Sequence, residues 1–489
     1  MRVDLYFLLA LLALRTVFLA FVPGILGGDG MLYASAAQAV LQSGLAPDAV
    51  FQSRTYSVLI APLLIMTGSD ALQPIDMSQL TYGHPIAQAI LYWHVMLDLV
   101  VVGIILSVYR KMRPDGVIWF RAGYVLIALQ PFTAVWVNQV LPDQMSAATF
   151  FIGLYLLARI DGSTKAGFRT VPWAAISLGL SGLLRIDMAL LGLALIAAWM
   201  LALLRPLGKR WAAMAIYAGL AFATPFAMMG SYQYVSRGSF AYVDTNAPDN
   251  PDVQQGGYNA WTRAWVLYPH EFLEFVTGSG MAGWRGYDAS AFPDRAFASA
   301  SQRAEVQKAL QKWRDEGYSP AIDATFRAAA AALRQERPAQ AYLIAPMQRT
   351  VLTWVNPDGA APLHHGLNLQ PPWTKIATAI VALMKLMVGA LALLGIAAVI
   401  IGAYRTGLQY LRSYPTRVAA LAFAALALRA IEMFAVNLLV KSPALESRYG
   451  LATWPGILVL SLFGLKHAPM IWDICRRRVV NSRKPIGAP

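Results

Sequence analysis

Charged residues are scarce in this chain of 489 residues. Asp, Glu, Lys and Arg make up 13% of it, against roughly 25% in an ordinary soluble domain. So few charges, combined with 57% hydrophobic residues, exclude a soluble enzyme, a disordered chain and a disulfide scaffold. Cys475 is the only cysteine, which excludes an internal disulfide and a cysteine-based metal site. The sequence also lacks a Gly-rich phosphate loop and a nucleotide-binding fingerprint.

Long apolar runs are what the chain has instead, and its mean hydropathy is +0.49. A membrane-spanning helix needs about 20 apolar residues. The segments interpreted as spans are 5–23, 84–109, 118–138, 143–159, 170–184, 187–204, 211–230, 375–403, 415–440 and 448–466. The sequence therefore predicts an all-α polytopic membrane protein with about ten transmembrane helices, eleven or twelve remaining open. No small-residue cleavage site follows the first segment, so we interpret it as an uncleaved span.

The spans divide the chain into three parts. Residues 1–230 form an N-terminal transmembrane module whose first outer loop is 24–83, residues 231–374 form a large extracytoplasmic loop domain, and residues 375–489 hold the last spans and a basic tail. The apolar segment 56–68 is too short to span, so we expect a helix that lies at the membrane surface or re-enters it. Within the large loop, 296–313 and 321–337 are helical by composition, and the Gly-, Asn- and Pro-rich front half predicts loop or short strand.

Lys and Arg set the predicted orientation, because they gather in short cytoplasmic loops. Twenty of them fall on one side: Arg2, Arg110, Lys111, Arg113, Arg121, Arg159, Lys165, Arg169, Arg205, Lys209, Arg210, Arg405, Arg412, Arg417, Lys466, Arg476, Arg477, Arg478, Arg483 and Lys484. The short loops opposite hold only Arg54, Arg185, Lys441 and Arg448. We expect both termini to be cytoplasmic, in the inner (cytoplasmic) membrane of the cell. The formal net charge of +14 is thereby assigned to these loops and not to nucleic-acid binding.

The predicted outer side carries several polar residues that neither a membrane span nor a short loop requires. Each has a structural explanation alone: Asp29 and Asp143 could cap helices, Arg185 could pair with Asp187, and Arg448 could reach headgroups. Together they place carboxylates and arginines at helix ends on one side of the membrane, where such groups are functional candidates. The set is Asp29, Arg54, Asp143, Arg185, Glu446, Arg448 and Tyr449.

This combination suits transfer to a hydroxyl group. A carboxylate can accept the proton of an attacking hydroxyl. Arginine guanidinium groups can hold a phosphate leaving group through forked hydrogen bonds.

The residues around these positions resemble, in order along the chain, the motifs of the GT-C glycosyltransferases. The segments that carry the likeness are GGDGMLYASAAQAVLQSG, SRTY before a short apolar helix, LPDQMSAATFF, LGLSGLLRID and ESRYGLATWP. The branch that it resembles contains protein O-mannosyltransferases, the lipid A aminoarabinose transferase and the rhizobial galacturonosyltransferases. The chain departs from the pattern where it lacks a double proline after Arg54 and a serine before Asp143, and where the last proline moves to 455.

The resemblance implies a GT-C fold and a hexosyl- or pentosyltransferase. Its donor would be a polyprenyl-phosphate-linked sugar held in the lipid bilayer, and its acceptor a glycan, a lipid or a protein outside the membrane. It assigns Asp29 as the catalytic base and Asp143 to positioning donor or acceptor, or to sharing a metal. Arg448 and Arg54, then Arg185, would bind phosphate, and Glu446 would orient Arg448. A divalent cation remains open, although the sequence offers no Asp-x-Asp pair.

Other residues have two interpretations each. His364 and His365 lie on the outer side before the eighth span, where they are plain loop residues, substrate contacts or metal ligands. Tyr258, Trp261, Trp265 and Trp284 either stack on a saccharide or form the core of the loop domain. Arg15 and Arg429 lie within predicted spans, and we interpret them as structural, with a lipid-phosphate contact as the alternative.

Two other functions also fit a membrane protein of this kind. An O-antigen polymerase or ligase would depend on arginines of the large loop and would not need Asp29, so Asp29→Asn separates it from the glycosyltransferase. A secondary transporter would need polar residues at the midplane of the membrane and inverted pairs of broken helices, which the sequence does not show. A non-catalytic receptor would depend on the large loop alone.

Overall fold

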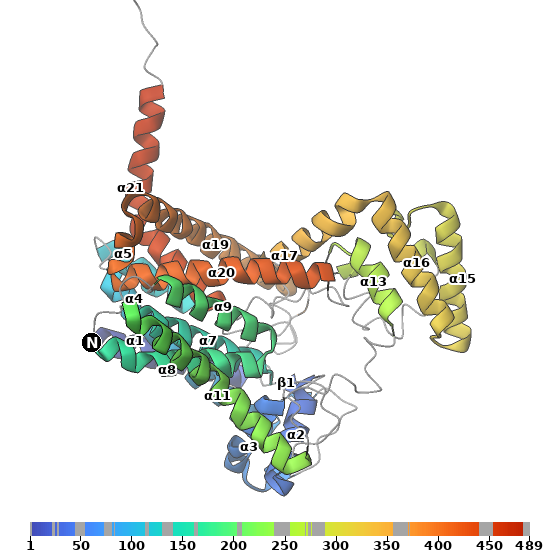
Figure 1. The fold of residues 1–489 in the computed structure, drawn as a ribbon, viewed down its shortest axis with the longest axis horizontal. Helices are drawn as coiled ribbons and strands as arrows, with labels where there is room; N and C mark the ends of the chain where they lie inside the picture. Colours follow the sequence, from blue (N-terminus) through green and yellow to red (C-terminus); the bar gives the residue numbers. More distant parts are fainter. Residues whose placement is uncertain are drawn as a thin grey trace, which may run out of the picture. The chain divides into compact units, whose positions relative to one another are not determined.

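The computed structural model describes residues 2–21, 25–26, 29–44, 54–72, 81–82, 84–112, 117–129, 140–160, 165–202, 208–238, 255–268, 270–271, 275, 289–355, 370, 372–439 and 453–482. These residues are nearly all helical (Figure 1). The chain divides into two compact units. Unit 1 comprises Met1–Val243, Gly359–Ala427 and Leu451–Pro489, and unit 2 comprises Asp244–Asp358 and Leu428–Gly450.

Unit 1 contains most of the long helices. Its elements are α1 (Arg2–Phe21), β1 (Ile25–Leu26), α2 (Asp29–Ser43), α3 (Arg54–Leu64), η1 (Ile65–Leu72), β2 (Thr81–Tyr82), α4 (Pro85–Met112), α5 (Val117–Leu129), α7 (Pro142–Ala158), α8 (Lys165–Leu184), α9 (Asp187–Ala202), η2 (Gly208–Arg210), α11 (Trp211–Arg237), α19 (Trp373–Thr406), η8 (Gly407–Arg412), the start of α20 (Tyr414–Leu439) and α21 (Trp454–Ser482). The two short strands pair antiparallel, Ile25 with Tyr82 and Leu26 with Thr81.

Each of the ten segments predicted to span the membrane overlaps a helix of the described residues. Five helices are long and apolar enough to cross a membrane by length and composition, namely α1, α4, α11, α19 and α20. A helix satisfies its backbone hydrogen bonds internally, which is the condition for crossing lipid. The protein is therefore a helical, multi-pass membrane protein, as the sequence predicted. Ten crossings, and the orientation, stay predictions.

Small residues allow the last membrane helices of unit 1 to approach closely. A Cβ atom added at Gly395 of α19 would overlap the carbonyl oxygen of Leu460 in α21. A Cβ added at Gly464 of α21 would overlap the carbonyl oxygen of Leu391 in α19. Lipid provides no hydrophobic drive for helices to associate, so close backbone packing at small residues stabilises such pairs. These two glycines fix how α19 and α21 pack.

Unit 2 is a smaller helical domain. Its elements are α13 (Gly256–Trp265), η4 (Ala289–Ala291), η5 (Asp294–Ala296), α15 (Ala300–Glu316), α16 (Pro320–Glu336), the π-helical turn η6 (Gln340–Ile344), α17 (Ala345–Val355) and the end of α20 from Leu428. Helices α15 and α16 confirm the two helices predicted in the large loop. Their first turns are capped by Ser299 and Ser319, whose side chains accept hydrogen bonds from the N–H groups of Gln302 and Ile322.

The prediction of loop or short strand for the front half of the large loop is wrong at α13. Tyr258, Trp261 and Trp265 recur at helical spacing there, and burial of their shared face outweighs the low helix propensity of the glycine and asparagine beside them. All three are at most 2% exposed in the core of unit 2. The saccharide-stacking interpretation is therefore wrong for these three residues, and the core interpretation is confirmed. Trp284 lies outside the described residues.

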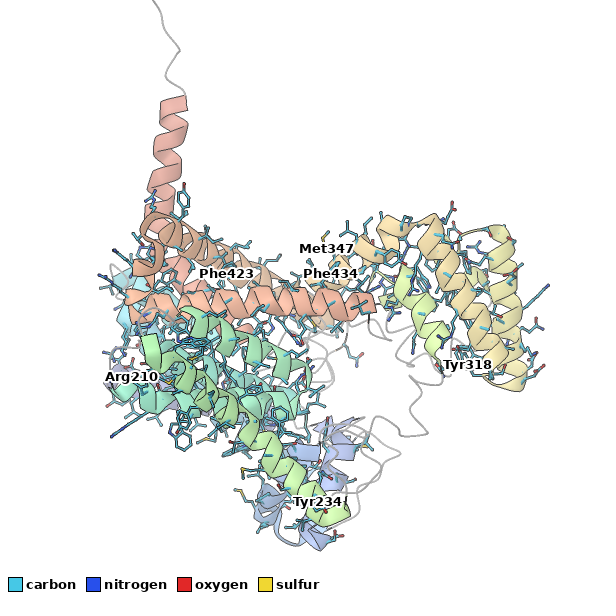
Figure 2. The ribbon with its side chains drawn as sticks, in the orientation of Figure 1. Arg210, Tyr234, Tyr318, Met347, Phe423 and Phe434 are labelled. Atoms are coloured by element: carbon cyan, nitrogen blue, oxygen red, sulfur yellow. The ribbon has the colours of Figure 1, made fainter. Side chains whose placement is uncertain are left out.

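A half-buried carboxylate joins α16 to the start of α13. Asp323 accepts hydrogen bonds from the N–H of Gly257 at 2.6 Å, the hydroxyl of Tyr318 at 2.8 Å and Nε of Arg327 at 2.5 Å. Tyr318 is labelled in Figure 2, at the turn between α15 and α16. Burial opposes ionisation of Asp323, but the bonds from Gly257, Arg327 and Tyr318 outweigh it and hold its pKa below the usual 3.8. The folded unit 2 thus stabilises the charged carboxylate.

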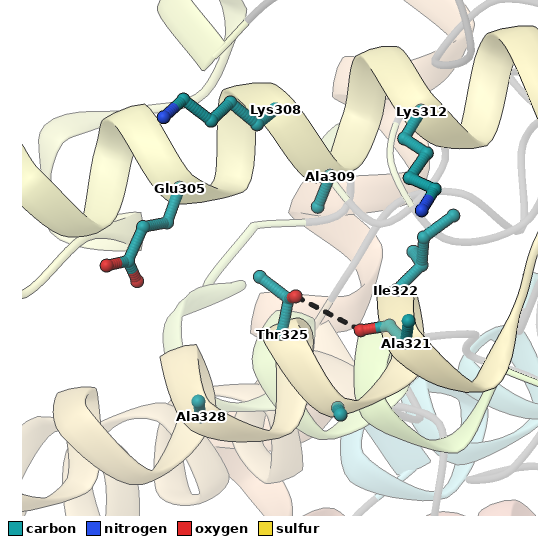
Figure 3. A pocket seen from close by; sticks show the side chains of 9 residues that line it. Glu305, Lys308, Ala309, Lys312, Ala321, Ile322, Thr325 and Ala328 are labelled. Atoms are coloured by element: carbon teal, nitrogen blue, oxygen red, sulfur yellow. Dashed lines mark hydrogen bonds between the residues drawn. The ribbon is translucent and has the colours of Figure 1, made fainter.

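A groove of about 510 Å³ lies between α15 and α16 (Figure 3). Glu305, Lys308 and Lys312 line it from α15, and Lys312 points toward Ile322 of α16. Thr325 of α16 donates a hydroxyl hydrogen bond to the carbonyl of Ala321. Its remaining lining is mostly alanine.

Candidate active site

One apolar cluster in unit 1 gathers the elements that carry four of the predicted site residues. Its buried members come from α2, α3, the start of α4, the start of α7 and the last residue of α8: Met31, Tyr33, Ala34, Ala37, Tyr56, Ile60, Ala61, Leu64, Ile86, Ala87, Ile90, Val140, Leu141, Met145 and Leu184. Asp29 begins α2 and Arg54 begins α3. Asp143 lies in the first turn of α7, and Arg185 follows α8 directly.

Asp143 and Arg185 are in direct contact. NH1 of Arg185 donates to Oδ1 of Asp143 across 42 residues of sequence. The other side of the same guanidinium pairs with Asp187, with Nε 3.1 Å from Oδ1 and NH2 2.9 Å from Oδ2. The side chains of Asp143 and Arg185 are 4% and 13% exposed. Arg185 therefore bridges two carboxylates, one of them buried.

The structure tests the structural explanations that the sequence allowed for Asp143 and for Arg185. Leu141 is the N-cap of α7, and no side chain caps that end. Asp143 is therefore an ion-pair partner and not a cap, although a negative charge in the first turn also favours the helix dipole. The local pair of Arg185 with Asp187 is confirmed, and the contact with Asp143 adds a third member that sequence alone did not pair with it.

Asp29 stands at the start of α2, and the backbone there touches the end of the loop that leads into α7. A Cβ added at Gly30 would lie 3.2 Å from the carbonyl oxygen of Val140. Val140 comes three residues before Asp143. The start of α2 and the start of α7 therefore meet. The side chains of Asp29 and Arg54 lie outside what the structure describes.

The other predicted site residues are outside the described residues. They are His364, His365, Glu446, Arg448 and Tyr449. Helix α21 begins five residues after Tyr449, at Trp454, and the ammonium of the buried Lys385 in α19 lies 6.0 Å from the Trp454 ring centre. Sequence reasoning did not single out Lys385, although a lysine inside a long apolar run is a signal of function.

Two further buried polar residues beside the candidate site were also missed. Tyr56 of α3 lies with its hydroxyl oxygen 3.2 Å from Nε2 of His94 in α4. Both side chains are fully buried. Burial, and then the nearby Tyr33 and Asp143, raise the pKa of Tyr56 well above its usual 10. Tyr56 is therefore a neutral phenol that shares its environment with Asp143.

Deeper in unit 1, Arg15 of α1 forms a buried ion pair with Asp98 of α4. NH2 of Arg15 lies 2.7 Å from Oδ2 of Asp98, with the side chains 6% and 1% exposed. In unit 2, NH1 of Arg429 lies 2.8 Å from Oε2 of Glu432. These pairs support the structural interpretation of both arginines. Among the described residues, no group of three or more His, Cys, Asp or Glu side chains could hold a metal ion.

Arg349 of α17 is the most extensively hydrogen-bonded arginine described in unit 2. NH1 donates to the carbonyls of Arg263 and Val266, both at 2.8 Å. Nε and NH2 donate to the side chain and the carbonyl of Asn437, at 3.1 and 2.8 Å. Burial, followed by the charge of Arg263, lowers the pKa of Arg349 to about 9. This guanidinium ties α13 and α17 to the last turn of α20, nine residues before Glu446.

No protein-family model matches the chain, and no curated protein matches its sequence. Among solved structures it is similar to the Archaeoglobus fulgidus oligosaccharyltransferase in the apo form, with a TM-score of 0.44 and 13% identity over 99% of this chain and 53% of that one. The Archaeoglobus fulgidus oligosaccharyltransferase AglB in complex with an inhibitory peptide and a dolichol-phosphate gives a TM-score of 0.40, with the same identity and shares. ArnT from Cupriavidus metallidurans bound to undecaprenyl phosphate gives 0.34 and 14% identity over 96% of this chain and 77% of that one. The chain spans about half the length of the oligosaccharyltransferase. At this level of similarity, function has to be inferred from the residues of this chain.

Proposed function

We propose that this protein is an inverting membrane glycosyltransferase of the GT-C type. It moves a sugar from a polyprenyl-phosphate-linked donor to a glycan, lipid or protein acceptor on the extracytoplasmic side. The donor's lipid tail stays in the bilayer, and its phosphate and sugar meet the outer ends of the helices. The acceptor hydroxyl attacks the anomeric carbon in line with the departing phosphate.

One observation carries the proposal. A single apolar cluster joins the starts of α2, α3 and α7 to the end of α8, and these are the positions of Asp29, Arg54, Asp143 and Arg185. Four charged residues spread over more than 150 positions of sequence thereby belong to one packed region of unit 1. Ionisable groups gathered at membrane depth are functional-site candidates by default.

Asp29 is the general base in this proposal. It deprotonates the acceptor hydroxyl as the bond to the anomeric carbon forms and the bond to the phosphate oxygen breaks. The proton passes to the Asp29 carboxylate, and the electron pair of the broken bond leaves with the phosphate. The position of Asp29 at a helix start suits an ionised carboxylate, because the helix dipole favours negative charge there.

Asp143 positions the reactants, and Arg185 positions Asp143. In the observed geometry the guanidinium of Arg185 is engaged by two carboxylates. We therefore assign Arg185 to holding Asp143 in place and rank it below Arg54 and Arg448 as a phosphate ligand. Arg54 and Arg448 bind the donor phosphate and offset the charge that grows on the leaving oxygen.

The remaining residues act around these groups. Glu446 orients Arg448, and Tyr449 lines the same turn. His364 and His365 contact substrate from the large loop. A hexose or a pentose fits this scheme equally, because none of these roles depends on the sugar.

The test separates the base from the phosphate ligands. Asp29→Asn should abolish turnover and leave binding of the polyprenyl-phosphate donor largely intact, because its role is confined to the transition state. Arg448→Ala and Arg54→Ala should each weaken donor binding about ten- to a hundredfold, the equivalent of one charge-assisted hydrogen bond. Arg448→Lys should recover part of the loss, because an ammonium keeps the charge without the fork. Asp294→Asn, at an exposed carboxylate of unit 2, is the matched control.

Donor binding and single-turnover rates of the purified full chain in nanodiscs decide between the outcomes. Full activity of Asp29→Asn would instead favour an O-antigen polymerase- or ligase-like enzyme. Donor-independent movement of a solute across the membrane would favour a secondary transporter. Normal donor binding by Arg448→Ala together with failed binding by Asp29→Asn would mean that the two roles are reversed.

A further inference from the structure

A cavity of unit 1 lies away from the candidate active site, where α4 ends and α20 begins. It has a volume of about 550 Å³ and is lined by α4, η8, α20 and α21. Lys111, Ser413, Thr416, Lys466 and His467 are among its lining residues. We call it the basic cavity. Both lysines belong to the set that predicts the cytoplasmic side, so the cavity faces away from the candidate active site.

The charge of the basic cavity has one sign. Its lining includes two lysines and a histidine, and none of the described residues that line it is a carboxylate. Burial, followed by the charge of Lys466, lowers the pKa of His467 below its usual 6.5. His467 is therefore neutral at pH 7, and the two ammonium groups carry the charge. A partly enclosed space with this lining attracts an anion.

Contacts at the start of α20 position the hydrogen-bond donors of the basic cavity. The ammonium of Lys111 lies 4.6 Å from the ring centre of Tyr414, the first residue of α20, and this contact holds the lysine over the helix start. The hydroxyls of Ser413 and Thr416 are 2.5 Å apart at the same helix start. The N–H of Thr416 is bonded to Ser413 Oγ at 3.4 Å, and Pro415 has no N–H, so this helix start contributes its partial positive charge and not free amide donors. The ammonium and hydroxyl groups thus line one space with the helix start.

The rest of the lining is apolar. Met112 and Phe463 are at most 2% exposed and line it, with the Phe463 ring packed on His467 at a centroid distance of 4.6 Å. A volume of this size falls in the range of ligand pockets, roughly 300–1,000 Å³, and exceeds what a bare phosphate ion fills. A lining that combines two ammonium groups with apolar side chains suits an amphipathic ligand.

We propose that the basic cavity binds the phosphate group of an anionic ligand, on the face opposite the proposed glycosyl transfer. The same chemistry is offered by the headgroup of an anionic phospholipid and by soluble phosphate. Basic pockets between membrane helices on the cytoplasmic side are suited to such headgroups. This site is independent of the proposed function, because none of its residues belongs to the candidate active site.

The experiment uses the full chain in detergent micelles, titrated with phosphatidylglycerol, with phosphatidylcholine or with inorganic phosphate. Binding is measured by native mass spectrometry and by the shift in the thermal unfolding midpoint. Wild type should bind phosphatidylglycerol more tightly than phosphatidylcholine. Lys111→Gln and Lys466→Gln should each lower that affinity about fivefold, and the double variant on the order of 25-fold. Lys111→Arg with Lys466→Arg keeps the charge and should retain binding, which separates loss of charge from misfolding.

Arg169→Gln is the matched control, because Arg169 is an exposed cation of the same predicted face on α8 and does not line the basic cavity. If millimolar inorganic phosphate displaces phosphatidylglycerol, the site binds the phosphate group of a lipid headgroup and soluble phosphate alike. Binding of phosphatidylglycerol without such competition would assign it to a lipid headgroup. The proposal is overturned if the double glutamine variant binds phosphatidylglycerol as tightly as Arg169→Gln does. It is equally overturned if wild type binds phosphatidylglycerol no more tightly than phosphatidylcholine and does not bind inorganic phosphate.

Discussion

Removing the charge of Asp143 should destabilise unit 1 less than removing its partner Arg185. Asp143→Asn deletes one charge-assisted hydrogen bond, worth about 1.5–3 kcal/mol. The guanidinium of Arg185 would still hold Asp187 through two nitrogens, at 2.9 and 3.1 Å. It would not be left as an unpaired buried charge. We therefore expect Asp143→Asn to lower the free energy of unfolding by about 1.5–3 kcal/mol.

Arg185→Gln has the larger predicted effect. It leaves the carboxylate of Asp143, only 4% exposed, without the arginine that neutralises it. Breaking a buried pair in this way typically costs about 3–5 kcal/mol. The double variant Asp143→Asn with Arg185→Gln should cost less than the sum of the two single variants, because the second change removes the charge that the first left unpaired.

The measurement is reversible unfolding of the purified protein in mixed micelles, with all three variants and the exposed-carboxylate control Asp294→Asn. The control should stay within about 0.5 kcal/mol of wild type. Additive effects of the two single changes would refute coupling between Asp143 and Arg185. A larger cost for Asp143→Asn than for Arg185→Gln would refute the bridging role of the guanidinium.

Four further results are expected. Arg349→Met should destabilise unit 2 in thermal unfolding by about 1–3 kcal/mol for each buried acceptor that it leaves without a hydrogen bond. The exposed Arg314→Met should cost less than about 0.5 kcal/mol. The folded-state pKa of Asp323 is below 3.8, so its contribution to stability is complete above that pH and is lost as pH falls through the folded value; Asp323→Asn should flatten this part of an acid-unfolding curve. Gly464→Val should lower the thermal midpoint sharply, because any Cβ there overlaps the α19 backbone. Strong chelation should leave most of the proposed transferase activity, since Arg185 already engages Asp143; complete loss restored by Mg²⁺ would contradict this.

The sequence predicted the helices of unit 1 because each needs a long apolar run, and such runs are visible in one dimension. It predicted α15 and α16 because α15 is rich in alanine, glutamine and lysine and α16 in alanine, which are strong helix formers. It missed α13, whose local composition favours a loop. Only the spacing of Tyr258, Trp261 and Trp265 indicated a helix. Burial in the core of unit 2 decides that case, and burial is a property of the whole fold.

The candidate site, like the fold, could be predicted from the sequence only in part. That charges gather at one set of helix ends follows from topology, and topology follows from the apolar runs and the lysines between them. That Arg185 reaches Asp143 does not follow, because the contact joins residues 42 positions apart. The contact between Tyr56 and His94 joins residues 38 apart and depends on how α3 packs on α4. Neither pair could have been chosen from sequence among the other charged and polar residues of unit 1.

The charge balance at the candidate site constrains how a donor phosphate could bind there. Arg185 is shared between Asp143 and Asp187, so these three residues together carry one net negative charge. Asp29 adds another if it is ionised, as a general base must be. A phosphate would be repelled by such a site unless further cations face it, and Arg54 and Arg448 are the cations that the predicted outer ends can supply. Losing either arginine should therefore weaken donor binding toward the upper end of the expected range, about a hundredfold, because the remaining charge no longer balances the carboxylates.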